Sequence, residues 1–197
     1  MTRPSSLLVV DDNEDNRDVL ARRLRQKDYV VTVAEDGSEA LELVEKGSYD
    51  LILLDVTMPG TGGLEVLSRL RTQHSETQLP IIMVTARAER ADIVEAFRLG
   101  ANDYVTKPID LPVVLARIRT HLAHKRAVED LHVSEERYAL AVRGANDGLW
   151  DWNLTTNEVY WSARWKAMLG YEESEMGVRP DEWLGRVHDD DLARVKV

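Results

Sequence analysis

The strongest constraint on this fold is a run of four large aliphatic residues, Leu51–Leu54, that ends directly on an acidic residue, Asp55. Apolar and polar residues do not alternate in this run, so we expect a strand with both faces covered, as in a parallel sheet. Asp55 then lies at the carboxyl end of the strand, where open α/β sheets bind ligands. Because a bare buried carboxylate is costly, we expect Asp55 to be solvated, paired with a cation or bound to a metal.

Strand-like and helix-like segments alternate through the first part of the chain. Short apolar runs predict strands at Leu7–Val10, Val30–Ala34, Leu51–Leu54, Ile81–Thr85 and Asp103–Thr106. Amphipathic patterns predict helices between them, at Asn13–Lys27, Ser38–Lys46, Gly63–Arg71 and Glu89–Leu99. This alternation indicates βαβ units, and therefore an α/β fold with a doubly wound parallel sheet.

A last helix of this part is predicted to begin after Asp110, a good N-cap, with Pro112 tolerated in its first turn. The helix should continue, because residues 121–142 contain neither Gly nor Pro. Its apolar residues follow a spacing close to a heptad, with Glu135 at the position where an apolar residue would complete it; they are Val128, Leu131, Tyr138 and Val142. Two interpretations stay open, a solvated linker helix and a helix that pairs with a second copy of itself.

The composition changes after residues 144–148, where two glycines flank a polar stretch and tryptophans become frequent. Alternating patterns predict a hairpin with strands at Leu149–Leu154 and Glu158–Ser162, followed by a short helix at Ala163–Leu169. Roughly fifty residues provide only a marginal core. This segment therefore reads as the beginning of a second domain.

The composition excludes several classes of function. The net charge is −10 and no Lys/Arg-rich run is present, so we expect no nucleic-acid partner. The chain has no cysteine, which excludes disulfides and thiolate metal sites. We find no apolar run near the ~20 residues of a membrane helix and no signal-peptide pattern, so we expect no membrane association and a cytoplasmic location.

Polar residues stand at the predicted carboxyl ends of four strands: Asp11 and Asp12, Asp55, Thr85, and Lys107. Because the carboxyl ends of parallel strands lie at one edge of a sheet, we expect these side chains to converge. Three carboxylates repel each other unless a cation joins them, and Mg²⁺ prefers such oxygen ligands. With the cation bound, an ionised Asp55 could attack a phosphorus atom and form an acyl phosphate, while Lys107 and Thr85 bind the phosphoryl oxygens.

Each of these residues also has a simpler interpretation. Asp11 or Asp12 could cap the helix that starts near Asn13. Thr85 could be an ordinary strand-end residue, and Lys107 a surface charge.

Residues of about 5–125 resemble the receiver domain of two-component response regulators. The resemblance is carried by Val9-Val10-Asp11-Asp12-Asn13, by Asp55 with Met58-Pro59 and Gly63, by Val84-Thr85-Ala86 and by Lys107-Pro108. It implies a flavodoxin-like, five-stranded sheet in the order 2-1-3-4-5. It also implies that Asp55 is the phosphoacceptor for a sensor histidine kinase or a phosphotransfer protein.

The resemblance implies roles for the other site residues as well. Asp11, Asp12, Asp55 and the backbone carbonyl of Thr57 would bind Mg²⁺, and Thr85 and Lys107 would contact the phosphoryl group. Tyr104 matches the aromatic residue that changes rotamer on activation. The Lys107–Pro108 bond is often cis in this family, and X–Pro bonds accommodate the cis form at small cost.

Residues from about 137 resemble the start of a PAS domain, through Arg137-Tyr138-Ala139-Leu140, Ala145–Trp152, Trp165–Tyr171 and Val187-His188-Asp189-Asp190. We therefore predict a receiver domain over 1–124, a linker helix over 125–142 and a partial α+β PAS domain over 143–197. Receiver–PAS chains of this kind often continue into domains of cyclic-di-GMP turnover, so any output enzyme would lie outside this chain.

Three functional hypotheses follow. The first is a non-enzymatic phosphorylation switch that acts through the linker helix on an output domain, as a homodimer formed by that helix and the PAS segment. The second is a dimerisation or scaffold module. The third is a Mg²⁺-dependent aspartate phosphatase; such enzymes usually carry an acid two residues after the nucleophile, where this chain has Thr57.

Overall fold

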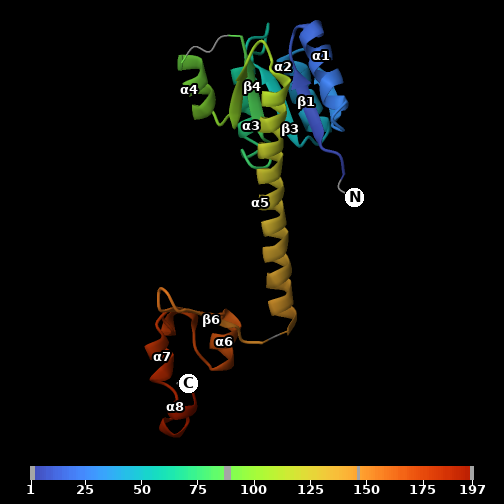
Figure 1. Cartoon of the computed structure of the whole chain (residues 1–197). Coiled ribbons are helices and arrows are strands. Elements are labelled where there is room, and N and C mark those ends of the chain that lie inside the picture. Colours follow the sequence, from blue (N-terminus) through green and yellow to red (C-terminus); the bar gives the residue numbers. More distant parts are fainter. Residues whose placement is uncertain (1–2, 87–89, 146, 196–197) are drawn as a thin grey trace. The chain divides into compact units, whose positions relative to one another are not determined.

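The computed structural model describes residues 3–86, 90–145 and 147–195. The chain divides into two compact units, Met1–Asp130 and Leu131–Val197 (Figure 1). The boundaries predicted for a separate linker helix and PAS segment remain predictions.

The first unit is an α/β layer structure. Its elements are β1 (Ser6–Val10), α1 (Glu14–Arg25), β2 (Val30–Ala34), α2 (Gly37–Lys46), β3 (Leu51–Asp55), α3 (Gly63–Arg71), β4 (Ile81–Thr85), α4 (Arg90–Arg98), β5 (Asp103–Thr106) and the first part of α5 (Leu111–Ala145), a helix that continues past the end of this unit. The five strands form one parallel sheet in the order β2-β1-β3-β4-β5. The predicted fold class and strand order are confirmed.

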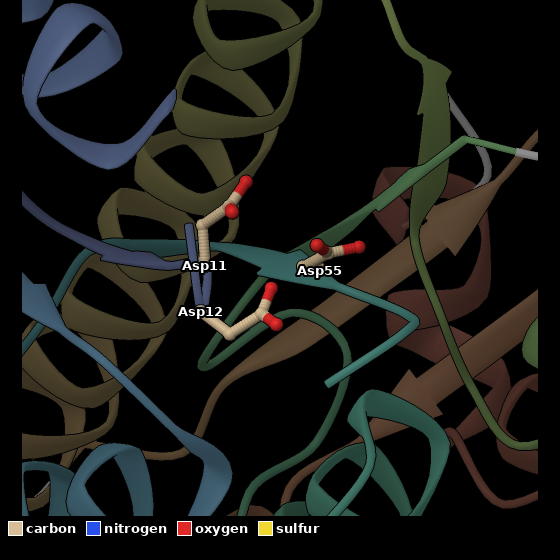
Figure 2. Close-up of side chains that lie close together, drawn as sticks. All are labelled: Asp11, Asp12 and Asp55. Atoms are coloured by element: carbon tan, nitrogen blue, oxygen red, sulfur yellow. The ribbon is translucent and has the colours of Figure 1, made fainter. Parts of the chain in front are cut away.

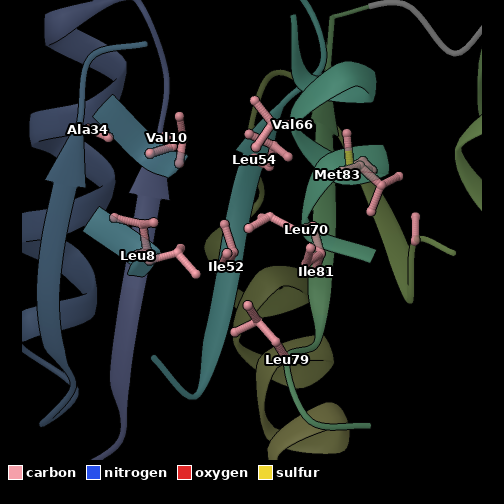
Figure 3. Packing of buried hydrophobic residues seen from close by; sticks show 14 of the residues in the cluster. Leu8, Val10, Ala34, Ile52, Leu54, Val66, Leu70, Leu79, Ile81 and Met83 are labelled. Carbon is pink, nitrogen blue, oxygen red and sulfur yellow. The ribbon is translucent and has the colours of Figure 1, made fainter. Parts of the chain in front are cut away.

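Alternate residues of the central strands enter two cores, one on each face of the sheet. Leu8 and Ile52 face α2, α3 and α4, in a core that also contains Val66 and Leu70 (Figure 3). Their neighbours on the same strands face α1 and α5, in a core that includes Leu7, Leu51, Leu53, Leu24 and Ile118. All five residues of β3 are buried, as expected for a strand covered on both sides.

Capping side chains refine the predicted helix boundaries. The Asn13 side chain caps α1 by accepting a hydrogen bond from the Asn16 N–H at 3.0 Å. The interpretation of Asp11 or Asp12 as the cap is therefore wrong. Asp36 caps α2 by accepting a hydrogen bond from the Glu39 N–H, and this helix begins at Gly37, one residue earlier than the predicted Ser38. The predicted start of the fourth helix at Glu89 lies outside the described residues, and α4 is described from Arg90.

Helix α5 is anchored where it passes the amino-terminal edge of the sheet. Lys125 is buried, and its Nζ lies 3.4 Å from Oδ1 of Asp50, the residue before β3. The other oxygen of Asp50 accepts a hydrogen bond from the Ser6 N–H at 2.8 Å. Arg126 donates to the hydroxyl of Ser5 at 2.6 Å. These contacts join α5 to the beginnings of β1 and β3, and the helix then continues to Ala145, beyond the predicted residue 142.

Asp103 at the start of β5 makes a second polar junction with α5. It pairs with Arg117, lies 3.3 Å from Nε2 of His121 and accepts the Tyr104 N–H at 2.8 Å. Burial opposes ionisation of Asp103, but the hydrogen bonds from these three groups lower the pKa of its carboxyl below the ordinary value.

In the variant Asp103→Asn, the free energy of unfolding should decrease less on acidification than it does in wild type. A carboxyl whose pKa is lower in the folded state stabilises the fold above its unfolded pKa of about 3.9, and this stabilisation is lost as pH falls through the folded pKa. Urea unfolding at neutral pH and near pH 3 measures the effect. The difference between the two free energies should be smaller in Asp103→Asn than in wild type, and equal differences would contradict a role for this carboxyl.

The second unit contains a small antiparallel sheet of β6 (Trp150–Asn153) and β7 (Glu158–Trp161). It is followed by α6 (Ala163–Met168), the 3₁₀ helix η1 (Glu173–Glu175), α7 (Pro180–Leu184) and α8 (Asp189–Val195). Val159, Trp161 and Met176 form its core, and the Trp161 and Trp165 rings stack with centroids 4.3 Å apart. The predicted hairpin and helix are confirmed, with slightly shorter elements.

Within the described part of the chain, no helix is both long and apolar enough to cross a bilayer.

Candidate functional site

Three carboxylates meet at the carboxyl edge of the parallel sheet (Figure 2). Asp11 and Asp12 follow β1, and Asp55 is the last residue of the neighbouring strand β3. One oxygen of each carboxylate can be chosen so that all three lie within 4.8 Å of one another. Asp11 and Asp55 are buried, whereas Asp12 is exposed. The predicted acidic cluster is therefore formed, and one of its sides is open to solvent.

Lys107 joins two of these carboxylates. Its Nζ lies 2.6 Å from Oδ2 of Asp55 and 2.8 Å from Oδ2 of Asp11. Burial opposes the charge of Lys107, but the hydrogen bonds and negative charges of Asp11 and Asp55 together raise the pKa of Lys107 above its ordinary value. The interpretation of Lys107 as a simple surface charge is wrong, because it is the cation of the site.

Asp55 is held in a polar setting at the end of an apolar strand. Burial raises the pKa of the Asp55 carboxyl above its ordinary value, and the contacts with Lys107 and the Thr57 N–H offset only part of this effect. The Thr57 N–H donates to Oδ1 of Asp55 at 3.2 Å. Oδ2 faces the Lys107 ammonium, so this cation supports the ionised form that a nucleophile requires.

The donor set fits a hard divalent cation. The structure offers three carboxylates within reach of a common point, and Mg²⁺ takes oxygen ligands at about 2.0–2.1 Å while keeping several waters. The exposure of Asp12 leaves room for those waters on the solvent side. Arg17 also donates to the Asp11 carbonyl at 2.8 Å, which helps to hold the main chain at this residue.

Thr85 and Tyr104 occupy different surroundings. Thr85 is buried at the end of β4, next to β3, and its carbonyl accepts the Lys107 N–H at 2.7 Å. Tyr104 packs instead beside α4 and α5: its ring meets Phe97 edge-on at 6.0 Å, and the Arg117 guanidinium lies 5.8 Å from its centroid. The structure thus brings Thr85 and Lys107 to one edge and places Tyr104 on the α4–β5–α5 side. The Lys107–Pro108 bond is cis, as the resemblance implied.

Gly63 has a structural role that the sequence analysis did not explain. A Cβ at this position would lie 2.0 Å from the carbonyl oxygen of Asp55 and 2.9 Å from Cα of Val56. The Gly63 N–H also donates to the Val56 carbonyl at 3.1 Å. The first turn of α3 therefore packs directly on the backbone that carries Asp55. The sequence signal was the Gly62-Gly63 pair at a helix start, where side-chain caps are usually preferred.

A cleft adjoins the site between α1 and the loop that leads into α5. It has a volume of about 250 Å³, and Lys107 and Pro108 form part of its wall. Its apolar lining comes from Val19, Leu20, Ile109 and Leu111. Val19 is 38% exposed, so α1 presents apolar surface beside the acidic cluster.

Two family profiles match the chain. The response regulator receiver domain matches residues 7–119, and the PAS fold matches residues 158–197. These matches agree with the resemblances drawn from the sequence.

Individual relatives match part of the chain. The chain is 47% identical over 116 residues to the uncharacterized transcriptional regulatory protein YkoG of Bacillus subtilis, which covers 59% of this chain and 50% of that protein. It is 35% identical over 133 residues to a probable cyclic di-GMP phosphodiesterase of Vibrio cholerae, covering 68% of this chain and 30% of that protein. The match thus spans half or less of these curated relatives' length.

A solved structure is similar to the first unit. The CheY-like receiver domain protein of Methanospirillum hungatei is 26% identical and has a TM-score of 0.60, covering 64% of this chain and 98% of that one. The receiver match covers more than half of the chain, its fold is the one observed, and the acidic cluster stands at the expected edge. The chain therefore belongs to the response regulator receiver family and carries a receiver domain of two-component signalling, followed by part of a PAS fold.

Proposed function

We propose that Asp55 is the phosphoacceptor of this receiver domain. The observation that carries the proposal is the position of the Lys107 ammonium, within hydrogen-bond distance of both Asp55 and Asp11 at the open acidic cluster. An oxygen of Asp55 attacks the phosphorus of a phosphohistidine on a sensor histidine kinase or phosphotransfer protein. The new O–P bond forms as the P–N bond breaks, and the imidazole leaves with the electron pair of that bond.

The other residues of the site would contact the transferred phosphoryl group or hold the metal ion. Lys107 shifts from the free carboxylate to an oxygen of the transferred group, and the Thr85 hydroxyl donates to another. Asp11, Asp12, Asp55 and the Thr57 carbonyl would hold Mg²⁺. When bound, this ion neutralises part of the negative charge that gathers on the carboxylates and phosphoryl oxygens.

The change is passed to the α4–β5–α5 side, where Tyr104 contacts Phe97 and Arg117. Movement of Thr85 toward the phosphoryl group would make room for Tyr104 to move, and α5 carries the change onward. A local charge change then biases a two-state element. By analogy with the Vibrio cholerae relative, the output served by this receiver is cyclic-di-GMP turnover, in the cytoplasm.

The direct test is transfer from a phosphorylated histidine phosphotransfer protein in the presence of Mg²⁺. The labelled phosphoryl group should appear on wild-type protein at no more than one equivalent per chain, and it should be absent from Asp55→Asn. Catalytic turnover of a small aryl phosphate would support the aspartate phosphatase instead. Thr57 argues against that outcome, because it leaves the position two residues after Asp55 without a carboxyl group for acid–base catalysis.

The cleft beside Lys107 supplies a second prediction, that α1 docks the phosphodonor protein. Val19→Glu should slow transfer from the protein donor by about tenfold or more. The reason is that docking would bury a charged side chain where wild type buries an apolar one. The same variant should accept phosphate from acetyl phosphate at the wild-type rate, since that donor needs no protein surface. Equal slowing with both donors would place the fault in the acceptor site and contradict docking at α1.

A further inference from the structure

Two of the three carboxylates in the acidic cluster come from adjacent residues, Asp11 and Asp12, which directly follow β1. In an extended strand, the side chains of neighbouring residues point to opposite faces of the sheet. Both carboxylates nevertheless reach one cluster, in which an oxygen of each and an oxygen of Asp55 all lie within 4.8 Å of one another (Figure 2). Their convergence therefore depends on the orientation of the peptide unit that joins Asp11 to Asp12, beyond the end of the strand.

Asp11 is held from three directions. Its Oδ1 accepts a hydrogen bond from the Asn13 N–H at 3.0 Å, and its Oδ2 lies 2.8 Å from Nζ of Lys107. Its carbonyl oxygen accepts a hydrogen bond from Nη1 of Arg17 at 2.8 Å. The third contact differs from the other two, because the carbonyl belongs to the peptide unit that leads to Asp12.

Asp12 has no comparable support for its side chain. It is exposed, and within the described part of the chain no hydrogen bond or ion pair holds its carboxylate. The direction of this carboxylate is therefore set by its own rotamer and by the backbone before it. Arg17 is half-buried on α1, and its guanidinium makes a charge-assisted hydrogen bond, which is stronger than a bond between neutral groups.

We propose that Arg17 is a positioning residue of the cation site, which orients the peptide unit between Asp11 and Asp12 so that the Asp12 carboxylate is aimed at the ion. Arg17 acts through Asp12 and is not a ligand itself, because a guanidinium carries donors only. The inference deepens the proposed function and rests on it, since it takes the acidic cluster to be a Mg²⁺ site.

The charge of Arg17 acts in the opposite direction to its hydrogen bond. A guanidinium beside a cation site repels the ion, so removal of a charge that has no positioning role should tighten Mg²⁺ binding. Removal of a hydrogen bond that aims a ligand should weaken Mg²⁺ binding. The direction of the change in affinity therefore separates the two roles of Arg17.

Calorimetric titration of the full chain with Mg²⁺ measures this direction. Arg17→Met should raise the dissociation constant by about tenfold, as is usual when a group that orients a metal ligand is removed. Arg22→Met, which removes an exposed guanidinium from the same helix, should leave the dissociation constant unchanged. Arg17→Lys keeps the charge and a donor on a shorter side chain, so it should show a smaller loss in the same direction. This variant carries the test if Arg17→Met does not fold.

A double-mutant cycle tests whether Arg17 acts through Asp12. In the Asp12→Asn background, Arg17→Met should change the Mg²⁺ dissociation constant much less than in wild type, because the ligand that it aims is already altered. Tighter or unchanged binding by Arg17→Met, or an equal loss in the two backgrounds, would overturn the positioning role.

Phosphorylation by acetyl phosphate gives a second readout. For Arg17→Met, the Mg²⁺ concentration at the half-maximal rate should rise by the same factor as the dissociation constant. The rate at saturating Mg²⁺ should stay near that of wild type, because Lys107 and Thr85 are unchanged. A rate that stays low at saturating Mg²⁺ would assign Arg17 to the acceptor chemistry and overturn the proposal.

The titrations also separate this inference from the proposed function. Wild-type protein that does not bind Mg²⁺ would overturn the cation site, and the role of Arg17 with it. Wild-type binding that Arg17→Met leaves unchanged would overturn the role of Arg17 alone.

Discussion

Lys107→Met should lower the free energy of unfolding by about 2 kcal/mol or more at neutral pH without divalent cations. The Lys107 ammonium is within 2.8 Å of both Asp55 and Asp11, which are almost fully buried. Its removal leaves two neighbouring carboxylates unpaired, and each must be desolvated against the charge of the other. Urea denaturation in the presence of a chelator measures the loss.

The stabilisation of each protein by Mg²⁺ serves as a control for this prediction. A cation that binds the folded state stabilises it by mass action, and Mg²⁺ no longer competes with an ammonium in Lys107→Met. Mg²⁺ should therefore stabilise this variant more than wild type. Lys46→Met, which removes an exposed ion pair with Glu42, should change stability little under either condition. A Lys107→Met protein as stable as wild type, or indifferent to Mg²⁺, would contradict the view of Lys107 as the cation that balances the cluster.

Gly63→Ala should destabilise the receiver domain by about 3 kcal/mol or more, at the upper end of overpacking effects. The new Cβ would lie 2.0 Å from the Asp55 carbonyl oxygen, and both nearest residues contribute backbone atoms rather than flexible side chains. Relief requires α3 to move away from the end of β3, which also displaces Asp55. We therefore expect a lower Tm together with slower phosphorylation of the folded fraction.

Gly62→Ala is the matched control for that change. A Cβ at Gly62 would have one atom within 4 Å, the Val56 carbonyl oxygen at 3.9 Å, which is ordinary van der Waals contact. Thermal unfolding followed by circular dichroism should show a large decrease in Tm for Gly63→Ala and a small change for Gly62→Ala. Similar Tm values for the two variants would show that the close packing of α3 on Asp55 does not matter.

The sequence predicted those parts of the molecule that depend on local pattern. The unalternating run Leu51–Leu54 predicted a strand buried on both faces, and the positions of Asp11, Asp55 and Lys107 after strands predicted their convergence. The strand order came from the family resemblance, because periodicity does not specify which strands are neighbours.

Features that depend on tertiary contacts were not predicted. The role of Gly63 follows from the distance between α3 and the Asp55 backbone, and the sequence contains no direct sign of that distance. The pairing of Lys125 with Asp50 joins residues 75 positions apart. Asn13 caps α1, whereas the neighbouring Asp11 pairs with Lys107, a residue far away in the sequence.

The central claim, that Asp55 accepts a phosphoryl group, is tested most directly by intact-mass measurement after incubation with Mg²⁺ and acetyl phosphate. Wild type should gain the mass of one phosphoryl group, hydroxylamine should remove it as expected for an acyl phosphate, and folded Asp55→Asn should gain nothing. An equal adduct on Asp55→Asn, or none on folded wild-type protein with either acetyl phosphate or a phosphohistidine donor, would contradict the claim.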